Sequence, residues 1–358
     1  MTTYPSSRKV PGFAKFKNKK PNQVRADSSD LVSMQTLFPG HELPLVVTPK
    51  VSGLHLTGWL EENRQLIEAK LMQHGGVLFR GFDIETDQDL AHFIESQPYE
   101  RMSYFEGSTP RKAMGDRIYT STLYPQNETI ALHNEYSSSM RFPLKVWFSC
   151  LVAPEKGTGQ TPVCSARRML KRIDPDVLEE FRVKGWSLIR NFRYNLGLTW
   201  QRAYAIGNKP ELERYLTKNL IEFEWPGEDH LRTFQVRSAI VTHPVTQEEA
   251  WFNHMAFWHA ANLRDGVREE LIGQLGIEGL PYHTYYGDGS PIPDDVARHV
   301  AECYLKEKLM FDWEKGDILL ADNILISHGR QPFTSERKIL VAMGQPHFRP
   351  IFQPCVTA

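Results

Sequence analysis

Short apolar runs, each bounded by Gly, Pro or Asn, place the tightest limit on how this chain can fold. Runs of this kind are typical of buried β-strands. They occur toward both ends of the sequence, and they do not alternate regularly with helices as a doubly wound parallel sheet requires. We therefore expect a β-rich core with helices inserted between its strands. The runs are residues 77–81, 144–152, 239–243, 318–321, 324–327 and 339–343.

Helical periodicity occupies much of the sequence between these runs. Leu60, Ile67 and Leu71 follow helical spacing, and a Gly-Gly pair then ends the segment before the first apolar run. The same pattern of spacing and end signals recurs further along the chain. The expected helices are residues 59–74, 174–183, 211–219, 264–275 and 294–308.

The composition excludes several classes of protein. With 42 Lys and Arg against 43 Asp and Glu, the formal charge is -1, which argues against a nucleic-acid or membrane-surface binder. No run approaches the ~18 apolar residues of a membrane span, and the N-terminus lacks a signal-peptide apolar region. The four cysteines form no CxxC pair, which suits a reducing compartment. We expect a cytoplasmic protein.

The neutral total conceals a division of charge along the chain. Residues 1–26 carry seven bases and no acid, so their +7 leaves -8 for the remainder. Few apolar residues lie in this segment, which predicts a basic N-terminal arm outside the core. A solvated tail and a docking element for an acidic partner are both compatible with it. We expect residues 27–358 to form a single domain.

Chemistry is indicated by the segment around His133. If that segment is extended, His133 and Glu135 project from the same face of a strand, as two ligands of one metal ion would. His328 closes a later apolar run, and Arg337 opens another run nine residues further on. Two histidines and one carboxylate form the facial triad of non-haem Fe(II) oxygenases. An arginine nearby could hold a dicarboxylate by a bidentate pair.

The usual motifs of other enzyme classes are missing. No GxGxxG follows a strand, and the chain has no GxxxxGK[ST], HExxH or GxSxG sequence. Dinucleotide binding, P-loop hydrolysis, zinc proteolysis and serine hydrolysis therefore have no support.

Several phrases in fixed order resemble the taurine dioxygenase-like family of Fe(II)/2-oxoglutarate-dependent oxygenases, from about residue 77 to residue 344. The resemblance is nearest to the branch of nonribosomal peptide clusters typified by the syringomycin-pathway aspartyl β-hydroxylase. It implies a double-stranded β-helix (jelly roll) of α+β, mainly β, class with helical insertions. The phrases are Tyr119-Thr120-Ser121-Thr122, Leu132-His133-Asn134-Glu135, Gly159-Gln160-Thr161-Pro162, Leu196-Gly197-Leu198-Thr199-Trp200-Gln201, Trp251-Phe252-Asn253, Asp322-Asn323, His328-Gly329-Arg330 and Pro332-Phe333 through Arg337-Lys338.

The resemblance also implies roles for individual residues. His133, Glu135 and His328 would bind Fe(II), while Arg337 and Thr161 would hold the distal carboxylate of the co-substrate 2-oxoglutarate, with O2 as the second co-substrate. The family phrase Gly-Gly-Glu-Thr is altered around Thr161, and the spacing from His328 to Arg337 is shorter than in taurine dioxygenase. Strand periodicity does not choose between Arg337 and Lys338, because both faces of their strand are apolar. The family pattern favours Arg337.

Glu135 bears on the type of reaction. Related halogenases have a small residue at this position, which leaves a site for chloride, so a retained carboxylate predicts oxygen transfer. The resemblance implies hydroxylation of an unactivated C–H bond in an amino-acid-derived substrate, free or tethered to an acidic carrier protein, in natural-product (antibiotic) biosynthesis. Desaturation, cyclisation and epimerisation remain open, as does a non-catalytic jelly-roll binding protein. A homo-oligomer is compatible with the sequence.

Further polar residues are candidates for the substrate pocket. Asn253 is one by resemblance. His254 and His259 are five residues apart, which fits neither a strand pair nor one helix face, so we expect core or pocket-wall histidines. Arg190, Arg193 and Arg202 could meet a substrate carboxylate, although a solvated position is the general expectation for an arginine.

Overall fold

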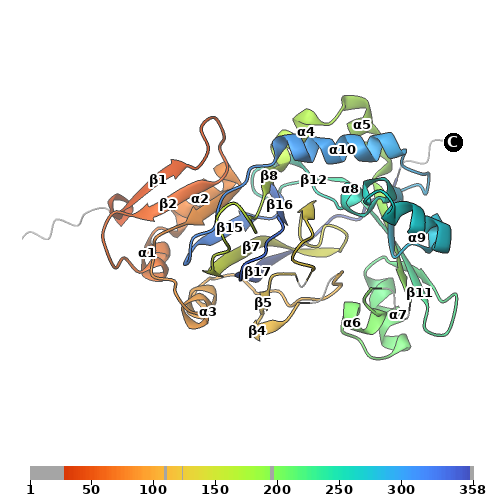
Figure 1. Ribbon diagram of the computed structural model, residues 1–358, viewed down its shortest axis with the longest axis horizontal. Helices are drawn as coiled ribbons and strands as arrows, with labels where there is room; N and C mark the ends of the chain where they lie inside the picture. Colours follow the sequence, from red (N-terminus) through yellow and green to blue (C-terminus); the bar gives the residue numbers. More distant parts are fainter. Residues whose placement is uncertain (1–27, 109–110, 123, 194–196, 355–358) are drawn as a thin grey trace, which may run out of the picture.

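The protein is described by a computed structural model that covers residues 28–108, 111–122, 124–193 and 197–354 (Figure 1). The basic arm expected at residues 1–26 lies outside the described residues. Within them, the expectation of a β-rich core with helical insertions is confirmed as a mixture of helices and strands arranged in four sheets.

The largest sheet has eight strands in the order β1-β2-β3-β15-β7-β17-β5-β4. Neighbouring strands are antiparallel except for the parallel pair β2–β3. Strands from both ends of the chain therefore meet in one sheet. Their bounds are β1 (Val32–Thr36), β2 (Leu45–Pro49), β3 (Gly76–Phe79), β4 (Ala113–Gly115), β5 (Ile118–Thr120), β7 (Arg141–Val152), β15 (Ile318–Asp322) and β17 (Lys338–Phe348).

A second sheet of three strands has the order β6-β16-β8, with β6 at Ile130–His133, β16 at Ile326–Arg330 and β8 at Val163–Ser165. It shares a hydrophobic core with the large sheet. Phe148 and Val341 from the large sheet pack in the same buried cluster as Ile326 and Val163 from the small sheet. Apolar side chains from both sheets therefore pack against one another in the space between the sheets.

The other face of the large sheet is covered by helices. Trp59, Ile67 and Phe93 belong to the cluster that buries this face against α1, α2 and α3. The expected helix over residues 59–74 is wrong in one respect, because Asn63 interrupts it and donates from its side chain to Trp59 O. The bounds of these helices are α1 (Leu56–Glu62), α2 (Arg64–His74) and α3 (Asp87–Glu95).

A third sheet, β10-β11-β9-β14, lies toward one end of the molecule together with α6 and α7 (Figure 1). The hairpin β12–β13 connects it to the core region. The strands are β9 (Trp186–Phe192), β10 (Glu222–Glu224), β11 (Leu231–Arg237), β12 (Ile240–Thr242), β13 (Glu249–Trp251) and β14 (Tyr282–Tyr286).

The helices expected at residues 174–183, 211–219, 264–275 and 294–308 are confirmed to within three residues at each end as α5, α7, α9 and α10, whereas α4, α6 and α8 were not expected. Figure 1 shows α10 lying along α4 and α5 at one side of the sheets. The helices are α4 (Ala166–Arg172), α5 (Pro175–Lys184), α6 (Trp200–Tyr204), α7 (Lys209–Lys218), α8 (Met255–Trp258), α9 (Val267–Leu275) and α10 (Asp294–Glu307), with 3-10 turns η1 (Ser28–Leu31), η2 (Ala260–Asn262) and η3 (Ile277–Gly279).

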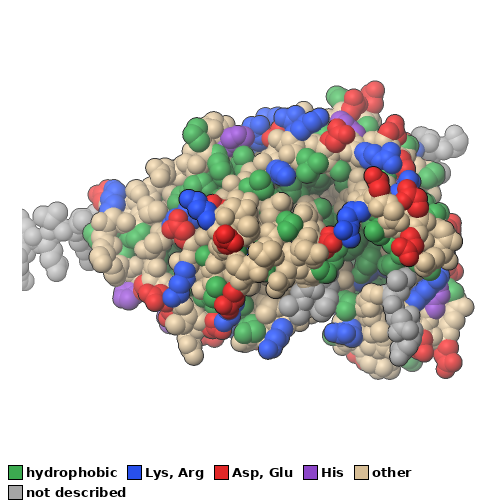
Figure 2. Space-filling model, in the orientation of Figure 1, with side chains coloured by type: hydrophobic (Ala, Val, Ile, Leu, Met, Phe, Trp, Pro, Cys, Tyr) green, Lys and Arg blue, Asp and Glu red, His purple; other side chains and the backbone are tan. Residues whose placement is uncertain are grey.

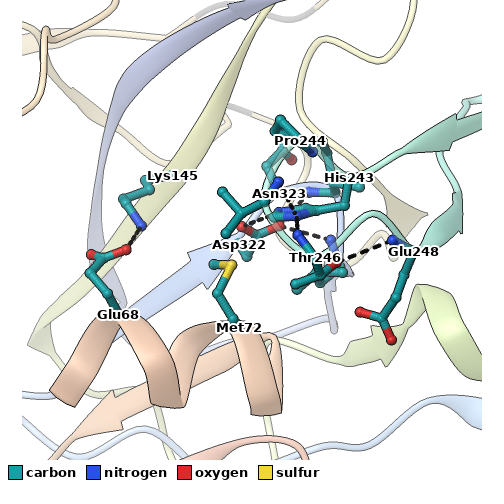
Figure 3. A network of polar contacts seen from close by, with 12 residues as sticks. Glu68, Met72, Lys145, His243, Pro244, Thr246, Glu248, Asp322 and Asn323 are labelled. Atoms are coloured by element: carbon teal, nitrogen blue, oxygen red, sulfur yellow. Dashed lines mark hydrogen bonds and ion pairs between the residues drawn. The ribbon is translucent and has the colours of Figure 1, made fainter. Parts of the chain in front are cut away.

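A buried polar network fixes the chain reversal between β15 and β16 (Figure 3). Asp322 Oδ1 accepts hydrogen bonds from the backbone N–H groups of Ile324 and Leu325, both at 3.0 Å. His243 Nδ1 accepts the N–H of Thr246, so its Nε2 carries the proton that it donates to Asp322 Oδ2 at 3.1 Å. This reversal sets the register of β16, the strand that ends near His328.

The surface agrees with the balanced composition. Figure 2 shows Lys and Arg side chains interspersed with Asp and Glu over the face in view. Among the described helices, none has both the length and the apolar composition to cross a membrane.

Candidate metal centre

Strand pairing brings His133 and His328 together from distant parts of the chain. His133 ends β6 and is the direct antiparallel partner of His328 on β16. Their ring centroids are 4.7 Å apart. The pairing of β6 with β16 therefore brings together two histidines that are 195 positions apart in the sequence.

Glu135 reaches the same point from a turn, which corrects the expectation that it shares a strand with His133. β6 ends at His133, and the next residues form a turn in which Tyr136 has φ 58°. Glu135 N donates to Asn323 Oδ1, and Asn323 Nδ2 donates back to Glu135 O, each at 2.8 Å. The Asp322-Asn323 reversal thus orients the carboxylate as well as β16.

The three side chains fit a metal ion. One ligand atom from each of His133, Glu135 and His328 lies within 4.8 Å of the others, and it is the one such cluster found among the described residues. His133 Nδ1 is 2.8 Å from Ala131 O, so Nδ1 carries the proton and Nε2 keeps its lone pair for a ligand bond. Two imidazoles and one carboxylate suit Fe(II) and leave coordination positions open.

Electrostatics prepare the same groups for a cation. Burial and the neighbouring His328 lower the pKa of His133 to about 4, so its imidazole is neutral at pH 7. Burial alone would raise the pKa of Glu135, but Arg111 and His328 outweigh it and hold that pKa well below its usual range. Neither ligand has to lose a proton when a metal binds.

A cavity next to the triad contains Arg337 and Thr161. Arg337 Nε donates to Gly159 O at 2.8 Å, and Nη2 donates to Thr161 Oγ1 at 3.3 Å. Trp313 Nε1 also donates to this oxygen, so the Thr161 hydroxyl can donate its own proton to a ligand. Burial, and then Arg330, lower the pKa of Arg337 to about 10, and no ion-pair partner of Arg337 occurs among the described residues. The cavity therefore presents a cation and a hydroxyl donor, and the carboxylate in its lining, Glu135, pairs with Arg111 and not with Arg337.

Arg337 directly precedes β17 and Lys338 is the first residue of that strand, and their side chains have different surroundings. The Lys338 ammonium pairs with Asp87, 2.7 Å from both carboxylate oxygens, beyond the cavity. This placement agrees with the expectation that Arg337, and not Lys338, faces the triad.

A second cavity opens on the other side of His133 and Glu135. Its wall includes the aromatic residues Phe257, Trp258 and Tyr282, of which Trp258 and Tyr282 are stacked at 4.0 Å between centroids. His254 also lines it and contacts His133 with ring centroids 5.2 Å apart. His254 is thus a pocket-wall histidine as expected, while His259 is buried outside the lining of this cavity.

Sequence reasoning missed several residues of this region. Arg190 was expected to be solvated, but it is buried and lines the second cavity, with its guanidinium over the Tyr282 ring. Arg111 pairs with Glu135 at 2.6 Å and was not considered. Asn134 donates to Asn323 O and Ile326 O. The placement of Asn134 and Asn323 within motif phrases was the available signal, since buried amides there need partners.

The side chain of Asn253 is hydrogen-bonded to backbone groups and does not face the triad cavities. Its side chain donates to Ala239 O and accepts from Met255 N, and it lies outside the linings of both cavities. A direct substrate contact by Asn253 therefore stays a prediction.

The arrangement of a buried facial triad beside an arginine-lined cavity defines a class of oxygenase, and comparison with known proteins gives the family. Residues 40–343 match the model of the Taurine catabolism dioxygenase TauD, TfdA family. The chain belongs to this family and is a non-haem Fe(II)/2-oxoglutarate-dependent dioxygenase.

Individual relatives agree with this assignment. The chain is 42% identical over 280 residues to the dapdiamide synthesis protein DdaC of Enterobacter agglomerans, covering 78% of this chain and 85% of DdaC. It is similar in fold to the crystal structure of PvcB from Pseudomonas aeruginosa, with a TM-score of 0.51 and 16% identity over 87% of this chain and 91% of that chain. Another structure of PvcB, described as an Fe, alpha-ketoglutarate dependent oxygenase from an isonitrile synthetic pathway, gives a TM-score of 0.53 at 15% identity and covers 94% and 95%.

Proposed function

We propose that this dioxygenase hydroxylates an unactivated C–H bond of an amino-acid-derived small molecule in natural-product biosynthesis. The observation that carries the proposal is the buried cluster of His133, Glu135 and His328 beside the unpaired cation of Arg337. The description of DdaC as a dapdiamide synthesis protein supports a biosynthetic role. The pathway described for PvcB is of the same kind.

In this proposal the triad holds Fe(II), and the cavity beside it holds 2-oxoglutarate. Bound Fe(II), with 2-oxoglutarate and O2, supplies the oxidising chemistry. Arg337 pairs with the distal carboxylate of the co-substrate, and Thr161 donates its hydroxyl proton to the same group. The Ala131 carbonyl keeps the proton of His133 on Nδ1 throughout, which holds the imidazole in its ligand orientation.

The second cavity holds the substrate in this proposal. Its aromatic wall on α8 and β14 excludes water and orients the C–H bond toward the metal. Glu135 favours oxygen transfer over chlorination, because its carboxylate occupies the position that a halide would take. The Asn323 amide keeps that carboxylate in place.

We propose that the eight-stranded and three-stranded sheets are the two faces of a double-stranded β-helix (jelly roll). Residues of both sheets line the cavity that holds Arg337, and the Phe148 and His328 rings from the two sheets lie 4.6 Å apart. Because β2 and β15 belong to one sheet, residues 27–358 are proposed as a single domain. Residues 1–26 are proposed as a basic arm that can dock an acidic carrier protein. The buried free thiols of Cys150, Cys164 and Cys303 support a reducing, cytoplasmic location.

The test uses anaerobic protein with Fe(II) and 2-oxoglutarate. Wild-type protein is expected to bind one Fe(II) and to develop the metal-to-ligand charge-transfer absorption of the chelate, and aerobic incubation with substrate is expected to yield succinate. Glu135→Ala removes one ligand and should weaken Fe(II) binding by a factor of roughly 10 to 100. Glu249→Ala is the matched control, since this carboxylate pairs with Arg182 at the surface.

Unchanged Fe(II) affinity in Glu135→Ala, or wild-type protein that never forms succinate with amino acids or carrier-bound amino acids, would contradict the proposal. The mass of the product separates the remaining outcomes. A gain of one oxygen indicates hydroxylation, a loss of two hydrogens indicates desaturation or cyclisation, and an unchanged mass with inverted configuration indicates epimerisation. Fe(II) binding without consumption of O2 would indicate a binding protein.

A further inference from the structure

Arg111 lies at the boundary between the two cavities beside the triad and lines both of them. Its side chain is only 5% exposed. The guanidinium lies over the Tyr104 ring, 4.8 Å from the centroid, and Nη2 donates to Glu135 Oε1 at 2.6 Å. The same carboxylate oxygen is 3.4 Å from His328 Nε2. A metal ion held by Glu135 and His328 would therefore lie beside the carboxylate that Arg111 contacts.

Two of the Arg111 donor groups are unused. Nε and Nη1 are buried, and neither has a hydrogen-bond partner within the part of the chain that the structure describes. A buried donor without a partner destabilises the folded protein, and more so when it carries charge. Such a group is retained at this cost where a ligand completes its hydrogen bonds.

The other charged groups lining the second cavity have more of their hydrogen-bonding capacity in use, although Arg190 Nε is also buried without a partner among the described residues. Glu106 accepts hydrogen bonds from the Ser139 and Tyr215 hydroxyls. Arg190 donates through both Nη atoms to the carbonyls of Glu106 and Gly107. Arg111 is therefore the charged residue of this lining with the most unused capacity.

The balance of charge indicates the sign of the missing ligand. Arg111, Arg190 and Glu106 line the second cavity, and the Glu135 carboxylate that Arg111 contacts is also one of the three candidate metal ligands. The two guanidinium groups of this lining therefore face one further carboxylate, that of Glu106. Burying a charged donor without a partner is costly, so a ligand that places a carboxylate group beside Arg111 fits best.

We propose that the second cavity binds its substrate through a carboxylate and that Arg111 is the residue that pairs with it. The inference rests on the proposed function and narrows the substrate to molecules with a free carboxylate group. Planar, bidentate pairing is the mode in which arginine recognises carboxylates. The distal carboxylate of 2-oxoglutarate does not need Arg111, because Arg337 and Thr161 lie together in the other cavity.

The experiment measures binding in anaerobic protein loaded with Fe(II) and 2-oxoglutarate. The probes are the proteinogenic L-amino acids, each as the free acid and as the α-amide, and the signal is the change in charge-transfer absorption when a probe enters. Free acids are expected to perturb the absorption more strongly than their amides. Arg111→Gln should weaken binding of the best acid roughly 10- to 100-fold and abolish its advantage over the amide. Arg111→Lys should restore part of the binding of the acid, because lysine keeps the positive charge but cannot form the bidentate pair.

Arg141→Gln is the matched control. Arg141 forms the same kind of contacts, an Nη2–Oε1 pair with Glu100 at 2.6 Å and a guanidinium over the Phe348 ring, and it lines neither cavity. The Arg141→Gln variant should bind the probes as strongly as wild-type protein does. Calorimetry of 2-oxoglutarate binding to each variant separates the two carboxylate sources, and its affinity should survive Arg111→Gln.

The inference is overturned if acids and amides perturb wild-type protein equally, if no acid does so, or if Arg111→Gln abolishes 2-oxoglutarate binding. In those cases the wild-type charge-transfer absorption still shows that Fe(II) and 2-oxoglutarate bind, and the formation of succinate still tests the proposed function. Wild-type protein that never develops this absorption would overturn both proposals.

Discussion

Arg337 and Lys338 are neighbours in the chain, but the structure gives their cations different surroundings. Arg337 faces Thr161 and the triad, while Lys338 pairs with Asp87 on the other side. Arg337 lines the cavity and Lys338 does not, so a substitution of Arg337 alters the cavity and one of Lys338 leaves it unchanged. Because the residues that follow are apolar on both faces of the strand, periodicity does not show which of the two cations lines the cavity.

Arg337→Gln is therefore expected to weaken 2-oxoglutarate binding roughly 10- to 100-fold, the loss of a charged hydrogen-bonded pair. Fe(II) binding should be unchanged, because Arg337 is not among the triad residues. Calorimetric titration with 2-oxoglutarate measures the effect. Lys338→Gln is the control, and a comparable loss in that variant would show that general charge, not position, is responsible.

At the scale of elements, the close approach of β6 and β16 depends on Gly329. A Cβ at this residue would lie 2.5 Å from Ile130 O and 3.2 Å from Ala131 O, both backbone atoms. Such backbone contacts cannot be relieved by a rotamer change, so the strands themselves must separate. Because His133 and His328 are a pair in this register, their spacing depends on the same contact.

Gly329→Ala should lower the free energy of unfolding by about 2 kcal/mol and weaken Fe(II) binding. Urea denaturation and Fe(II) titration measure the two effects. Gly273→Ala in α9 is the matched control, since a Cβ there has no neighbour within 4 Å. Its stability should stay equal or rise by about 0.5–1 kcal/mol. A Gly329→Ala variant that is as stable as wild type and binds Fe(II) equally well would contradict this prediction.

The packing of β14 against η2 has its own pH dependence. His283 Nδ1 accepts the Ala260 N–H at 3.2 Å, and burial followed by the neighbouring His259 lowers the pKa of His283 to about 4 from 6.5. The neutral imidazole is the form that the fold accommodates. Its contribution to stability is complete above pH 6.5 and is lost as the pH falls toward 4, because the unfolded chain binds the proton first.

We expect His283 to account for roughly 3 kcal/mol of stability lost between pH 6.5 and 4, at about 1.4 kcal/mol for each pH unit. His283→Asn keeps an acceptor for Ala260 but has no titrating group. The difference in unfolding free energy between the variant and wild type should therefore change with pH over this range. Parallel curves from urea denaturation at several pH values would refute this assignment.

At the scale of the whole molecule, charge is divided between the basic segment 1–26 and an acidic remainder. Opposite charges steer the association of proteins over distances of about 10 Å at physiological salt. A +7 segment would attract an acidic carrier protein, while a free amino acid would gain little from it. The division of charge thus matters only if the substrate is tethered.

Deletion of residues 1–26 is expected to slow turnover of a carrier-bound substrate at low salt and to have little effect at high salt. Turnover of the same amino acid in free form should not change. Steady-state rates at several salt concentrations measure both. Equal rates for the full-length and shortened proteins with the carrier-bound substrate would remove the docking role.

Local pattern by itself determined part of the secondary structure, such as β3, β7, β15, β17, α5 and α10, because apolar spacing and Gly, Pro and Asn signals act within a few residues. It did not predict short elements such as β6, β8 and α8. The order of motif phrases also identified His133, Glu135, His328, Arg337 and the family. Local pattern did not predict the turn that carries Glu135. Hydrogen bonds with the side-chain amide of Asn323, 188 positions away, stabilise that turn.

Only the tertiary structure decided which polar groups share a cavity. The burial of Arg190 and the pairing of Arg111 with Glu135 depend on contacts between distant segments, and no periodicity encodes them. The sequence specifies ligand chemistry through residue type. The charge that remains unpaired beside those ligands is set by the fold, because it depends on every partner that folding brings near.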